Sequence, residues 1–431
     1  MQDLPSEILE HLLEVRARAR GVSIDTRGDL TNHIFVAIRG ANFDGNTFVE
    51  HALAAGAVHA ITSDQAWHAH PKVTVVEDTL VALQQFALAY RNTWSCPVLA
   101  MTGSNGKTTT KELIRDVLAT TFKVHATAGN FNNHIGVPLT LLNSPAHPEF
   151  VVVEMGANHQ KEIQALAQMA LPSHGYITNI GLAHLEGFGG EEGVYLGKKE
   201  LFDQLRNAGG TAFVQTSDEK VRRAAEGIHD RVDVSLDGWK WQAREEGGAV
   251  VSSSDGEAFP VNLEGKYNLS NVIAALIIGQ HFKVPRDRAI EALSAYVPIN
   301  HRSQAVHTDH NWVLLDAYNA NPSSMTHAVT DFVERDHPQP LLILGDMAEL
   351  GDASERAHED LVNLVAKSKA GLWTVGSRFG NIHARQPHGD WRHFERCDDV
   401  VTHLQETPLR GHQILIKGSR SIGLERLMPN L

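Results

Sequence analysis

The sequence predicts an α/β protein of three domains: a small α/β domain, a central domain with a parallel sheet plus a small antiparallel sheet, and a C-terminal Rossmann-like domain. Three observations support this fold class. The chain has 431 residues, more than the about 250–300 over which one hydrophobic core usually extends. Apolar strands alternate with amphipathic helices through its middle, as in parallel sheets covered by helices. The same alternation begins again after Pro298.

The first domain is expected over residues 1–95. Apolar residues at helical spacing predict a helix around residues 8–15 and another over 79–91. Short apolar runs predict strands at 34–38, 58–62 and 73–76, with a helix at 52–57. Two polar clusters, at residues 25–27 and 43–45, are typical of turns, with a binding site as the less favoured alternative.

The central domain is expected over residues 96–297. Fully apolar runs predict strands at 98–102, 150–153, 176–180 and 211–214. From Val232 to Leu263 the pattern becomes short, alternating and punctuated by glycine, which predicts antiparallel strands. Helices are expected over residues 268–282 and 286–296.

The third domain is expected over residues 298–431. Its strands are predicted at 312–315, 341–344, 372–375 and 413–416, each followed by a polar or glycine-containing loop. Ligands of such sheets bind beyond the carboxyl ends of the strands, so this domain has a functional edge of its own.

Composition restricts the class of function. A formal net charge of −13 disfavours a nucleic-acid binder, which needs a basic surface to displace counterions. No apolar run approaches the ~20 residues of a transmembrane helix. The chain starts without the basic and apolar segments of a signal peptide, and its two cysteines lie far apart. A cytoplasmic protein without a membrane span is expected.

The most informative stretch is the turn between the strand at 98–102 and the helix that follows. Its glycines let backbone N–H groups surround an anion at a helix N-terminus, which predicts a nucleotide phosphate site. Lys107 would reach the phosphates and Thr108 would ligate Mg²⁺. The general motif has a glycine where this chain has Met101. The predicted nucleotide-binding residues here are Gly103, Ser104, Asn105, Gly106, Lys107, Thr108 and Thr109.

Other polar residues follow strands of the same predicted sheet. Glu154 ends an apolar strand about one β–α unit after the phosphate loop, where a carboxylate can hold Mg²⁺ or simply cap a helix. His184 lies in the loop after the next strand and would reach the same sheet edge, although loop histidines are commonly just solvated. An amide-rich segment at 129–138 and the pair Asn268 and Asn271 suit either turns or a hydrogen-bonding ligand.

Several strings together resemble the Mur ligase family over nearly the whole chain. They are TGSNGKTT at 102–109, NNHIGVP at 132–138, EMGANH at 154–159, TNIGLAHL at 178–185, YNANP at 318–322, LGDM at 344–347 with ELG at 349–351, and KGSR at 417–420. TGSNGKTT is the form in which this family carries its phosphate loop, so Met101 is no obstacle. The EMGAN and YNANP strings are most similar to the branch of the family that adds a dipeptide.

The resemblance implies an ATP-dependent amide ligase of peptidoglycan precursor synthesis. It would join D-alanyl-D-alanine to UDP-MurNAc-tripeptide after ATP phosphorylates the tripeptide carboxylate. It further implies two Mg²⁺ sites, a carbamylated lysine aligned with Lys198, and a monomer that binds small molecules and no nucleic acid. Lys199 stands where relatives commonly have glycine, and Tyr267 where they usually have histidine.

The resemblance also assigns roles to residues of this chain. Its catalytic set is Lys107, His184, Lys198 and Arg302. Nucleotide binding would add Asn268, Asn271 and Asp316 to the phosphate loop, and the metal ligands would be Thr108, Glu154, His184 and Lys198. Substrate binding would involve Thr26, Arg27, Phe43, Asp44, Asn132, Asn133, His134, Tyr318, Asn319 and Asn321.

Two alternatives remain open at this point. A sister ligase, such as one that adds a different amino acid or polyglutamate, would share these motifs. A nucleotide-dependent switch or scaffold would instead hydrolyse ATP without an acceptor and would keep its function when Lys198 is replaced.

Overall fold

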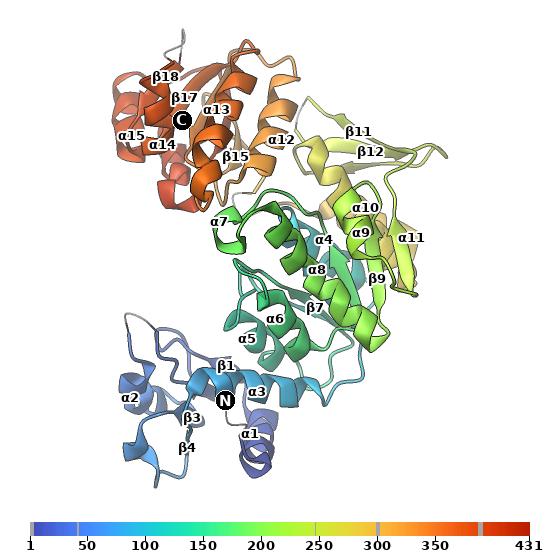
Figure 1. Cartoon of the computed structure of the whole chain (residues 1–431), viewed down its shortest axis with the longest axis vertical. Coiled ribbons are helices and arrows are strands. Elements are labelled where there is room, and N and C mark those ends of the chain that lie inside the picture. Colours follow the sequence, from blue (N-terminus) through green and yellow to red (C-terminus); the bar gives the residue numbers. More distant parts are fainter. Residues whose placement is uncertain (1–3, 41–42, 246, 299–301, 387–390) are drawn as a thin grey trace.

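The computed structural model describes residues 4–40, 43–245, 247–298, 302–386 and 391–431. Three parts follow one another along the long axis of the molecule, with the N-terminal part at one end and the C-terminal part at the other (Figure 1). Four separate sheets are present among the described residues. Among these residues, no helix is both long and apolar enough to cross a membrane.

The N-terminal part is a four-stranded parallel sheet in the order β1-β2-β3-β4 with three α-helices. The strands are β1 Gly21–Ser23, β2 His33–Val36, β3 His59–Thr62 and β4 Val73–Val75. The helices are α1 Ser6–Arg18, α2 Val49–Ala54 and α3 Thr79–Arg91. Helix α3 begins where the sequence predicts, because the Asp78 carboxylate accepts the free N–H groups of Leu80 and Val81. It packs against α5 (Gly136–Leu142) of the central part.

The central part is built on a six-stranded, all-parallel sheet in the order β10-β9-β8-β5-β7-β6. Its strands are β5 Val98–Thr102, β6 Val124–Ala126, β7 Phe150–Glu154, β8 His174–Ile177, β9 Thr211–Gln215 and β10 Arg231–Val234. Its other α-helices are α4 Lys107–Ala119, α6 Glu162–Ala170, α7 Leu185–Phe188, α8 Glu191–Ala208, α9 Glu219–Ala224, α10 Leu269–His281 and α11 Arg286–Ala295.

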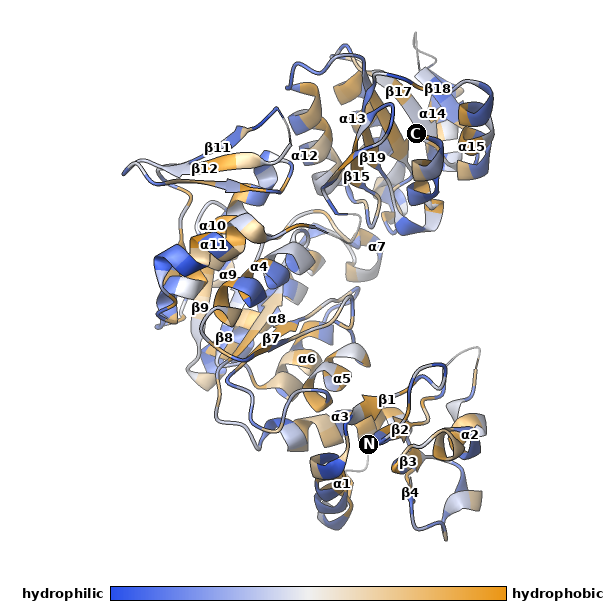
Figure 2. Cartoon of the chain, turned by 180° about the vertical axis from the view of Figure 1, so that it is seen from behind, coloured by the Kyte–Doolittle hydropathy of each residue, from blue (hydrophilic) through white to orange (hydrophobic). Residues whose placement is uncertain are grey.

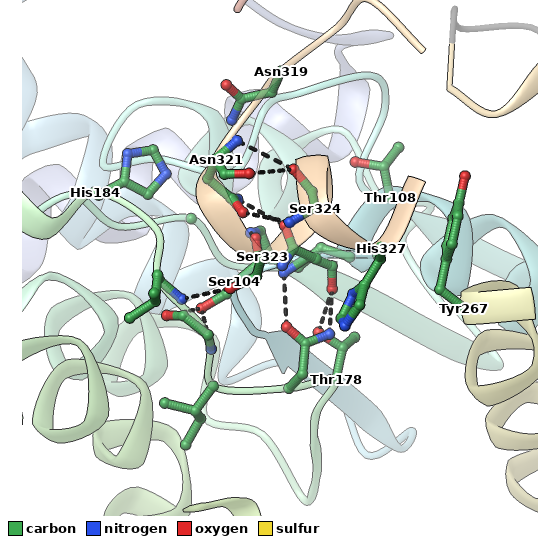
Figure 3. Close-up of a pocket in the computed structure, with 18 of the residues that line it drawn as sticks. Ser104, Thr108, Thr178, His184, Tyr267, Asn319, Asn321, Ser323, Ser324 and His327 are labelled. Carbon is green, nitrogen blue, oxygen red and sulfur yellow. Dashed lines mark hydrogen bonds between the residues drawn. The ribbon is translucent and has the colours of Figure 1, made fainter. Parts of the chain in front are cut away.

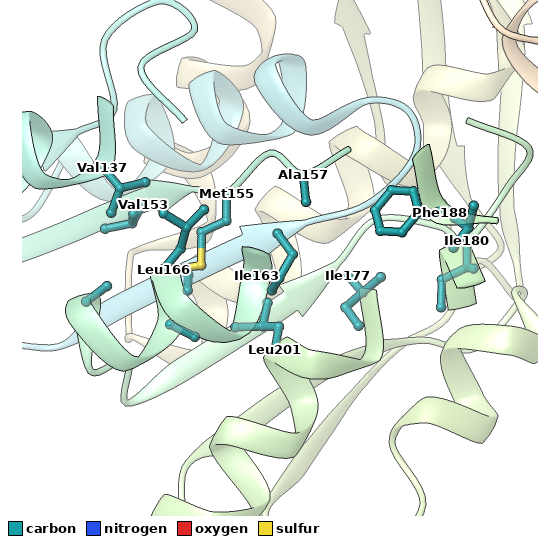
Figure 4. Packing of buried hydrophobic residues seen from close by; sticks show 14 of the residues in the cluster. Val137, Val153, Met155, Ala157, Ile163, Leu166, Ile177, Ile180, Phe188 and Leu201 are labelled. Carbon is teal, nitrogen blue, oxygen red and sulfur yellow. The ribbon is translucent and has the colours of Figure 1, made fainter. Parts of the chain in front are cut away.

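Successive residues of a central strand point to opposite faces of this sheet, and each face has its own core. Leu99 packs with the cluster formed by α4, α10 and α11, while Val98 belongs to the cluster that includes α6 and α8. Figure 4 shows the second cluster, where Val153 of β7 lies near Leu166 of α6. Since both faces are covered, the central strands β5 and β7 are buried along their whole length and almost entirely apolar, as the sequence indicates.

One prediction for this region is wrong in part. The segment from Val232 to Leu263 is not wholly antiparallel, because β10 pairs in parallel with β9 and completes the central sheet. Only the remainder forms the small antiparallel sheet, from β11 Trp239–Ala243, β12 Ala249–Ser253 and β13 Ala258–Val261. In β10 exposed and more buried residues alternate, as in antiparallel strands, because this strand is at the edge of the sheet.

The C-terminal part contains a six-stranded sheet in the order β14-β15-β19-β16-β17-β18, in which only β14 is antiparallel to its neighbour. The strands are β14 Gln304–His307, β15 Trp312–Asp316, β16 Pro340–Gly345, β17 Gly371–Val375, β18 Trp391–Phe394 and β19 Gln413–Lys417. The helices are α12 Pro322–Val333, α13 Ser354–Val365, α14 Ser377–His383 and α15 Cys397–Glu406. The hydrophobic residues concentrate on the strands and inner helix faces (Figure 2).

The predicted fold class is therefore confirmed. The register of the central sheet brings the functional loops together, since Met101 is opposite both Glu154 on β7 and Tyr176 on β8. The phosphate loop, Glu154 and the loop after β8 therefore lie together at the carboxyl ends of neighbouring strands, because these strands run parallel.

Candidate active site

The loop between β5 and α4 has a backbone that only glycine accommodates at two positions. Gly103 has φ +146 and Gly106 has φ +77, and a Cβ at Gly103 would lie 2.0 Å from the Thr178 hydroxyl. The Lys107 ammonium folds back over the loop and donates to the Gly103 carbonyl at 2.6 Å. Met101 is buried in β5, before the turn begins. The turn is thus built without a glycine at that position.

The electrostatics of this loop suit a bound anion. Burial lowers the pKa of Lys107 to about 8, with Glu154 opposing the shift and Arg302 adding to it. A phosphate beside this ammonium would restore its charge, since an anion favours the protonated form. The phosphate loop is fixed to the loop after β8 by the hydrogen bond that Ser104 N–H donates to the Asn179 carbonyl at 3.0 Å.

Glu154 has one satisfied and one unsatisfied carboxylate oxygen. Its Oε1 accepts from the Thr108 hydroxyl at 3.2 Å and from the Asn132 amide at 2.8 Å. Its Oε2 is buried and, among the described residues, has no hydrogen-bond partner. A hydroxyl and a carboxylate are the oxygen donors that Mg²⁺ takes in nucleotide sites, so these residues fit a magnesium ion. No group of three or more His, Cys, Asp or Glu side chains suited to a metal occurs in the described part of the chain.

Lys111 was not predicted, and it lies one helical turn beyond Lys107. Its side chain is buried, with Nζ 3.8 Å from Glu154 Oε2, 4.0 Å from Glu112 Oε1 and 3.3 Å from the Gly129 carbonyl. The same lysine therefore contacts the carboxylate beside the phosphate loop and the start of the amide-rich segment. A lysine on the apolar face of α4 is the only signal that the sequence contains for this role.

Lys198 and Lys199 occupy different environments on α8. Lys198 is 1% exposed, lies 3.5 Å from the Ala157 carbonyl and sits over the Phe188 ring. Burial, followed by the charge of Lys107, lowers its pKa well below the ordinary value. Lys199 instead forms an ion pair with Asp203 near the surface. Of these two lysines, only Lys198 is buried, and its burial disfavours the charged ammonium.

His184 lies at the same edge, immediately before α7, and faces the C-terminal part across the cleft (Figure 3). Its Nδ1 contacts the Glu349 carboxylate from the loop after β16. Burial and the charge of Lys107 lower the pKa of His184, against the opposing effect of Glu349. Glu349 belongs to the ELG string at 349–351, and the resemblance assigns it no individual role.

The predicted adenine contacts lie behind the phosphate loop. Asn268 and Asn271 are both buried, and Asn271 donates to Asn268 Oδ1 at 2.7 Å. Asn271 Oδ1 accepts from the Thr110 hydroxyl at 2.9 Å. Tyr267 places its hydroxyl 2.8 Å from the Ser303 hydroxyl. The pair is therefore rigidly held at one end of the cleft.

The C-terminal part contributes residues from the ends of β15 and the loop before α12. Asp316 pairs with Lys417 at 2.5 Å. The Tyr318 ring is contacted by two guanidinium groups, Arg302 at 3.8 Å and Arg420 at 5.3 Å from the centroid. In the turn after Tyr318, the Asn319 side chain accepts the Ala320 N–H.

The turn is joined to the phosphate loop across the cleft. Asn321 caps α12 and donates to Asn105 Oδ1 at 2.7 Å. This hydrogen bond joins two candidate substrate loops that are 216 positions apart in the sequence.

The amide-rich segment lies on the side of the cleft nearest the N-terminal part. Asn132 reaches Glu154, while Asn133 Oδ1 accepts the N–H groups at the start of α5. The His134 carbonyl accepts from Gln84 of α3 at 3.0 Å. This segment therefore connects the predicted metal residue to the N-terminal part.

The four predicted residues of the N-terminal part do not line the cleft. Thr26 and Arg27 lie in an exposed turn, where the Arg27 guanidinium lowers the pKa of Asp25 to about 2. Phe43 is 57% exposed, and Asp44 accepts the Asn46 N–H at the start of a short 3-10 helix. The structure therefore leaves them apart from the other candidate residues.

One large cleft unites the remaining candidates. Its volume is about 2060 Å³, and it is lined by the phosphate loop, the ends of β7 and β8, the start of α10 and the turn before α12. Of the predicted residues it includes Ser104, Asn105, Gly106, Lys107, Thr108, Thr109, Asn132, Asn133, His134, Glu154, His184, Asn268, Asn271, Arg302, Asp316, Tyr318, Asn319 and Asn321. Gly103 and Lys198 are buried and do not line the cleft.

Comparison with known families gives three matches that together cover most of the chain. The family models are the Mur ligase family, catalytic domain, over residues 18–91, the Mur ligase middle domain over 101–279, and the Mur ligase, glutamate ligase domain over 301–420. Two relatives named UDP-N-acetylmuramoyl-tripeptide–D-alanyl-D-alanine ligase align over 430 residues, 95% of this chain and 93% of each relative. The protein of Bacillus subtilis (strain 168) is 35% identical and that of Escherichia coli (strain K12) is 32% identical.

Solved structures give the same result for the fold. A crystal structure of MurF from Acinetobacter baumannii superposes with a TM-score of 0.84 at 26% identity, over 98% of each chain. A MurF ligase from Thermotoga maritima in complex with ADP gives a TM-score of 0.84 over 97% of each chain, and at 24% identity it shows the shared fold alone.

Proposed function

Since the chain belongs to the Mur ligase family, we propose that it is an ATP-dependent ligase that joins D-alanyl-D-alanine to UDP-MurNAc-tripeptide. The observation that carries this proposal is the cleft in which the phosphate loop and Glu154 meet the turn at Tyr318–Asn321. The full-length likeness to relatives named for this reaction supports the choice of substrates. We further propose that the reaction takes place in the cytoplasm and that the domains comprise residues 1–95, 96–297 and 298–431.

The first step would transfer the γ-phosphoryl group of ATP to the terminal carboxylate of the tripeptide. A carboxylate has no viable leaving group, so it must be activated before an amine can attack it. Lys107 and the backbone N–H groups of residues 103–109 would neutralise and orient the phosphates. Arg302, stacked on Tyr318 at the opposite wall, would stabilise charge on the transferred group.

The second step would be attack of the D-alanyl-D-alanine amine on the acyl phosphate. The C–N bond forms through a tetrahedral intermediate, and inorganic phosphate leaves with the oxygen that came from the carboxylate. Tyr318, Asn319 and Asn321 would hold the dipeptide, because they lie at the functional edge of the C-terminal sheet. Asn132, Asn133 and His134 would hold the peptide arm of the other substrate.

Nucleotide specificity would come from the other end of the cleft. Asn268 and Asn271 offer amide groups for the adenine edge, and Asp316 would accept from the ribose. Thr26, Arg27, Phe43 and Asp44 would bind the UDP-sugar at the N-terminal part. Since these four residues lie outside the cleft, the bound UDP-MurNAc-tripeptide would extend from the N-terminal part into the cleft.

Two magnesium ions would complete the site. Thr108 and Glu154 would hold one of them, consistent with Glu154 Oε2, which accepts no hydrogen bond from the described residues. His184 and a carbamylated Lys198 would hold the other. The ions would supply charge neutralisation of the phosphates. Lys198 fits carbamylation, because only a neutral amine adds carbon dioxide and burial favours that form.

The test is a ligation assay with ATP, Mg²⁺, D-alanyl-D-alanine and two UDP-MurNAc-tripeptides, ending in lysine or diaminopimelate. We expect phosphate release and a new UDP-MurNAc-pentapeptide with at least one of them, both dependent on the dipeptide. Phosphate release at the same rate without D-alanyl-D-alanine, or ligation only of a different amino acid, would refute the assignment.

A further inference from the structure

The contact between His184 and Glu349 crosses from the central part to the C-terminal part, with His184 at the end of the loop after β8 and Glu349 in the loop after β16. Both are non-glycine residues in the left-handed backbone region, with φ 54 and φ 60 respectively. Such residues are uncommon, and they gather at functional sites where the surroundings hold them.

Further hydrogen bonds hold the loop that carries His184. The Glu186 N–H donates to the Glu349 carbonyl at 3.3 Å, so backbone and side chain of Glu349 both contact this loop. On its other side, the Leu182 N–H donates to the Ser323 hydroxyl of α12 at 3.0 Å. The position of His184 therefore depends on two segments of the C-terminal part.

The chemistry of the contact fixes the proton on the imidazole. A carboxylate oxygen can only accept, so Nδ1 of His184 carries the hydrogen and Nε2 keeps its lone pair. The ring lines the cleft, and its electrostatic neighbours there are Lys107 and Lys198. The charged carboxylate on one nitrogen thus leaves the other nitrogen as an electron-pair donor within the site.

We propose that Glu349 is a positioning residue that holds His184 in the Nδ1–H tautomer. Because Glu349 belongs to the C-terminal part, His184 is oriented only when that part is seated against the central one. Metal-binding histidines commonly owe their tautomer to such an outer carboxylate. The consequence for a metal ion at His184 rests on the proposed function, whereas the tautomer itself does not.

The tautomer can be measured on the full chain without Mg²⁺ or nucleotide. Proton–nitrogen correlation spectra of ¹⁵N-histidine-labelled protein report which ring nitrogen carries the proton, and the His184 signal is the one lost in His184→Gln. We expect Nδ1–H in the wild type and in Glu349→Gln, whose amide oxygen still accepts. In Glu349→Ala we expect a shift toward Nε2–H. Glu355→Ala, which removes a surface ion pair with Arg385, is the control and should match the wild type.

A second measurement follows the consequence of that tautomer. In the ligation assay, the Mg²⁺ concentration for half-maximal rate should rise by about 10–100-fold in Glu349→Ala, the usual cost of removing an outer partner of a metal ligand. Glu349→Gln should show a smaller rise, and Glu355→Ala none.

The outcomes separate this proposal from the proposed function. An Nε2–H tautomer in the wild type, or a wild-type spectrum and Mg²⁺ dependence in Glu349→Ala, would overturn the positioning role. A wild-type chain that fails to ligate would refute the function alone, because the spectra contain neither metal nor substrate and still decide the tautomer.

Discussion

Replacement of Lys111 by methionine is expected to destabilise the central part strongly. Methionine keeps the apolar stem of the side chain and removes the ammonium. That ammonium is the cation next to Glu154 and Glu112, whose side chains are 1% and 11% exposed. The substitution therefore leaves two largely buried carboxylates facing a neutral side chain where the ammonium was.

The structure sets the size of the effect. At separations of 3.8 and 4.0 Å, each pair has a gross attraction of about 4 kcal/mol at an effective dielectric constant of about 20. The cost of burying the charges offsets much of this, and the removal of one partner from a buried ion pair typically costs about 3–5 kcal/mol. For a unit of about 200 residues this corresponds to a fall of about 6–20 °C in the unfolding midpoint.

Differential scanning calorimetry of the full chain, without nucleotide, measures this fall. Lys220→Met is a matched control, because Lys220 pairs with Glu191 at 3.2 Å on the surface, where the side chains are 41% and 62% exposed. It should change stability by less than about 1 kcal/mol. Added Mg²⁺ should raise the midpoint of Lys111→Met more than that of the wild type, since it can neutralise the two carboxylates that lose the ammonium. Equal midpoints for the two lysine variants would refute the reasoning.

Three further results are expected. Lys198→Ala should abolish ligation, and added acetate or formate should restore part of the rate. Lys199→Ala, at a surface ion pair, should keep most of the rate. The reverse order in an initial-rate assay would contradict the assignment. Burial lowers the pKa of His174 from 6.5 to about 4, so the unfolded chain binds more protons between these values and stability should fall as pH drops through them. His174→Phe should reduce that slope in urea titrations, and an unchanged slope would count against it. Arg335→Met removes the guanidinium that lies 2.7 Å from Glu264, whose side chain is 1% exposed. Because Arg335 is itself 19% exposed, we expect a loss of about 3 kcal/mol in the free energy of unfolding. The loss should appear as faster hydrogen exchange in residues 264–268, and unchanged exchange would show that the ion pair contributes little.

The buried strands and the phosphate loop could be predicted because their signals are local. A fully apolar run such as residues 150–153 has few alternatives to a strand buried on both faces. The glycines at 103 and 106 meet a backbone requirement that no other residue satisfies well. Most short edge strands gave no such signal: β1, β6, β14 and β18 were missed, and the alternating pattern of β10 was mistaken for an antiparallel strand.

Contacts between distant segments could not be predicted from local patterns. Apart from its place on the apolar face of α4, Lys111 has no feature in the sequence that sets it apart from other helix lysines, and only the fold places Glu154 of β7 beside it. Glu349 and His184 meet only because the C-terminal part is seated against the loop after β8. The roles of Thr26 and Phe43 rest on resemblance alone, and the structure keeps these residues away from the cleft, so they stay a prediction.

The central claim is that the tripeptide carboxylate is activated as an acyl phosphate within this cleft. It is tested most directly with UDP-MurNAc-tripeptide labelled with ¹⁸O in its terminal carboxylate, in the presence of ATP, Mg²⁺ and D-alanyl-D-alanine. Mass spectrometry of the released phosphate should find one ¹⁸O atom for each amide bond formed. Amide formation with unlabelled phosphate, whose oxygen then comes from water, would contradict the account.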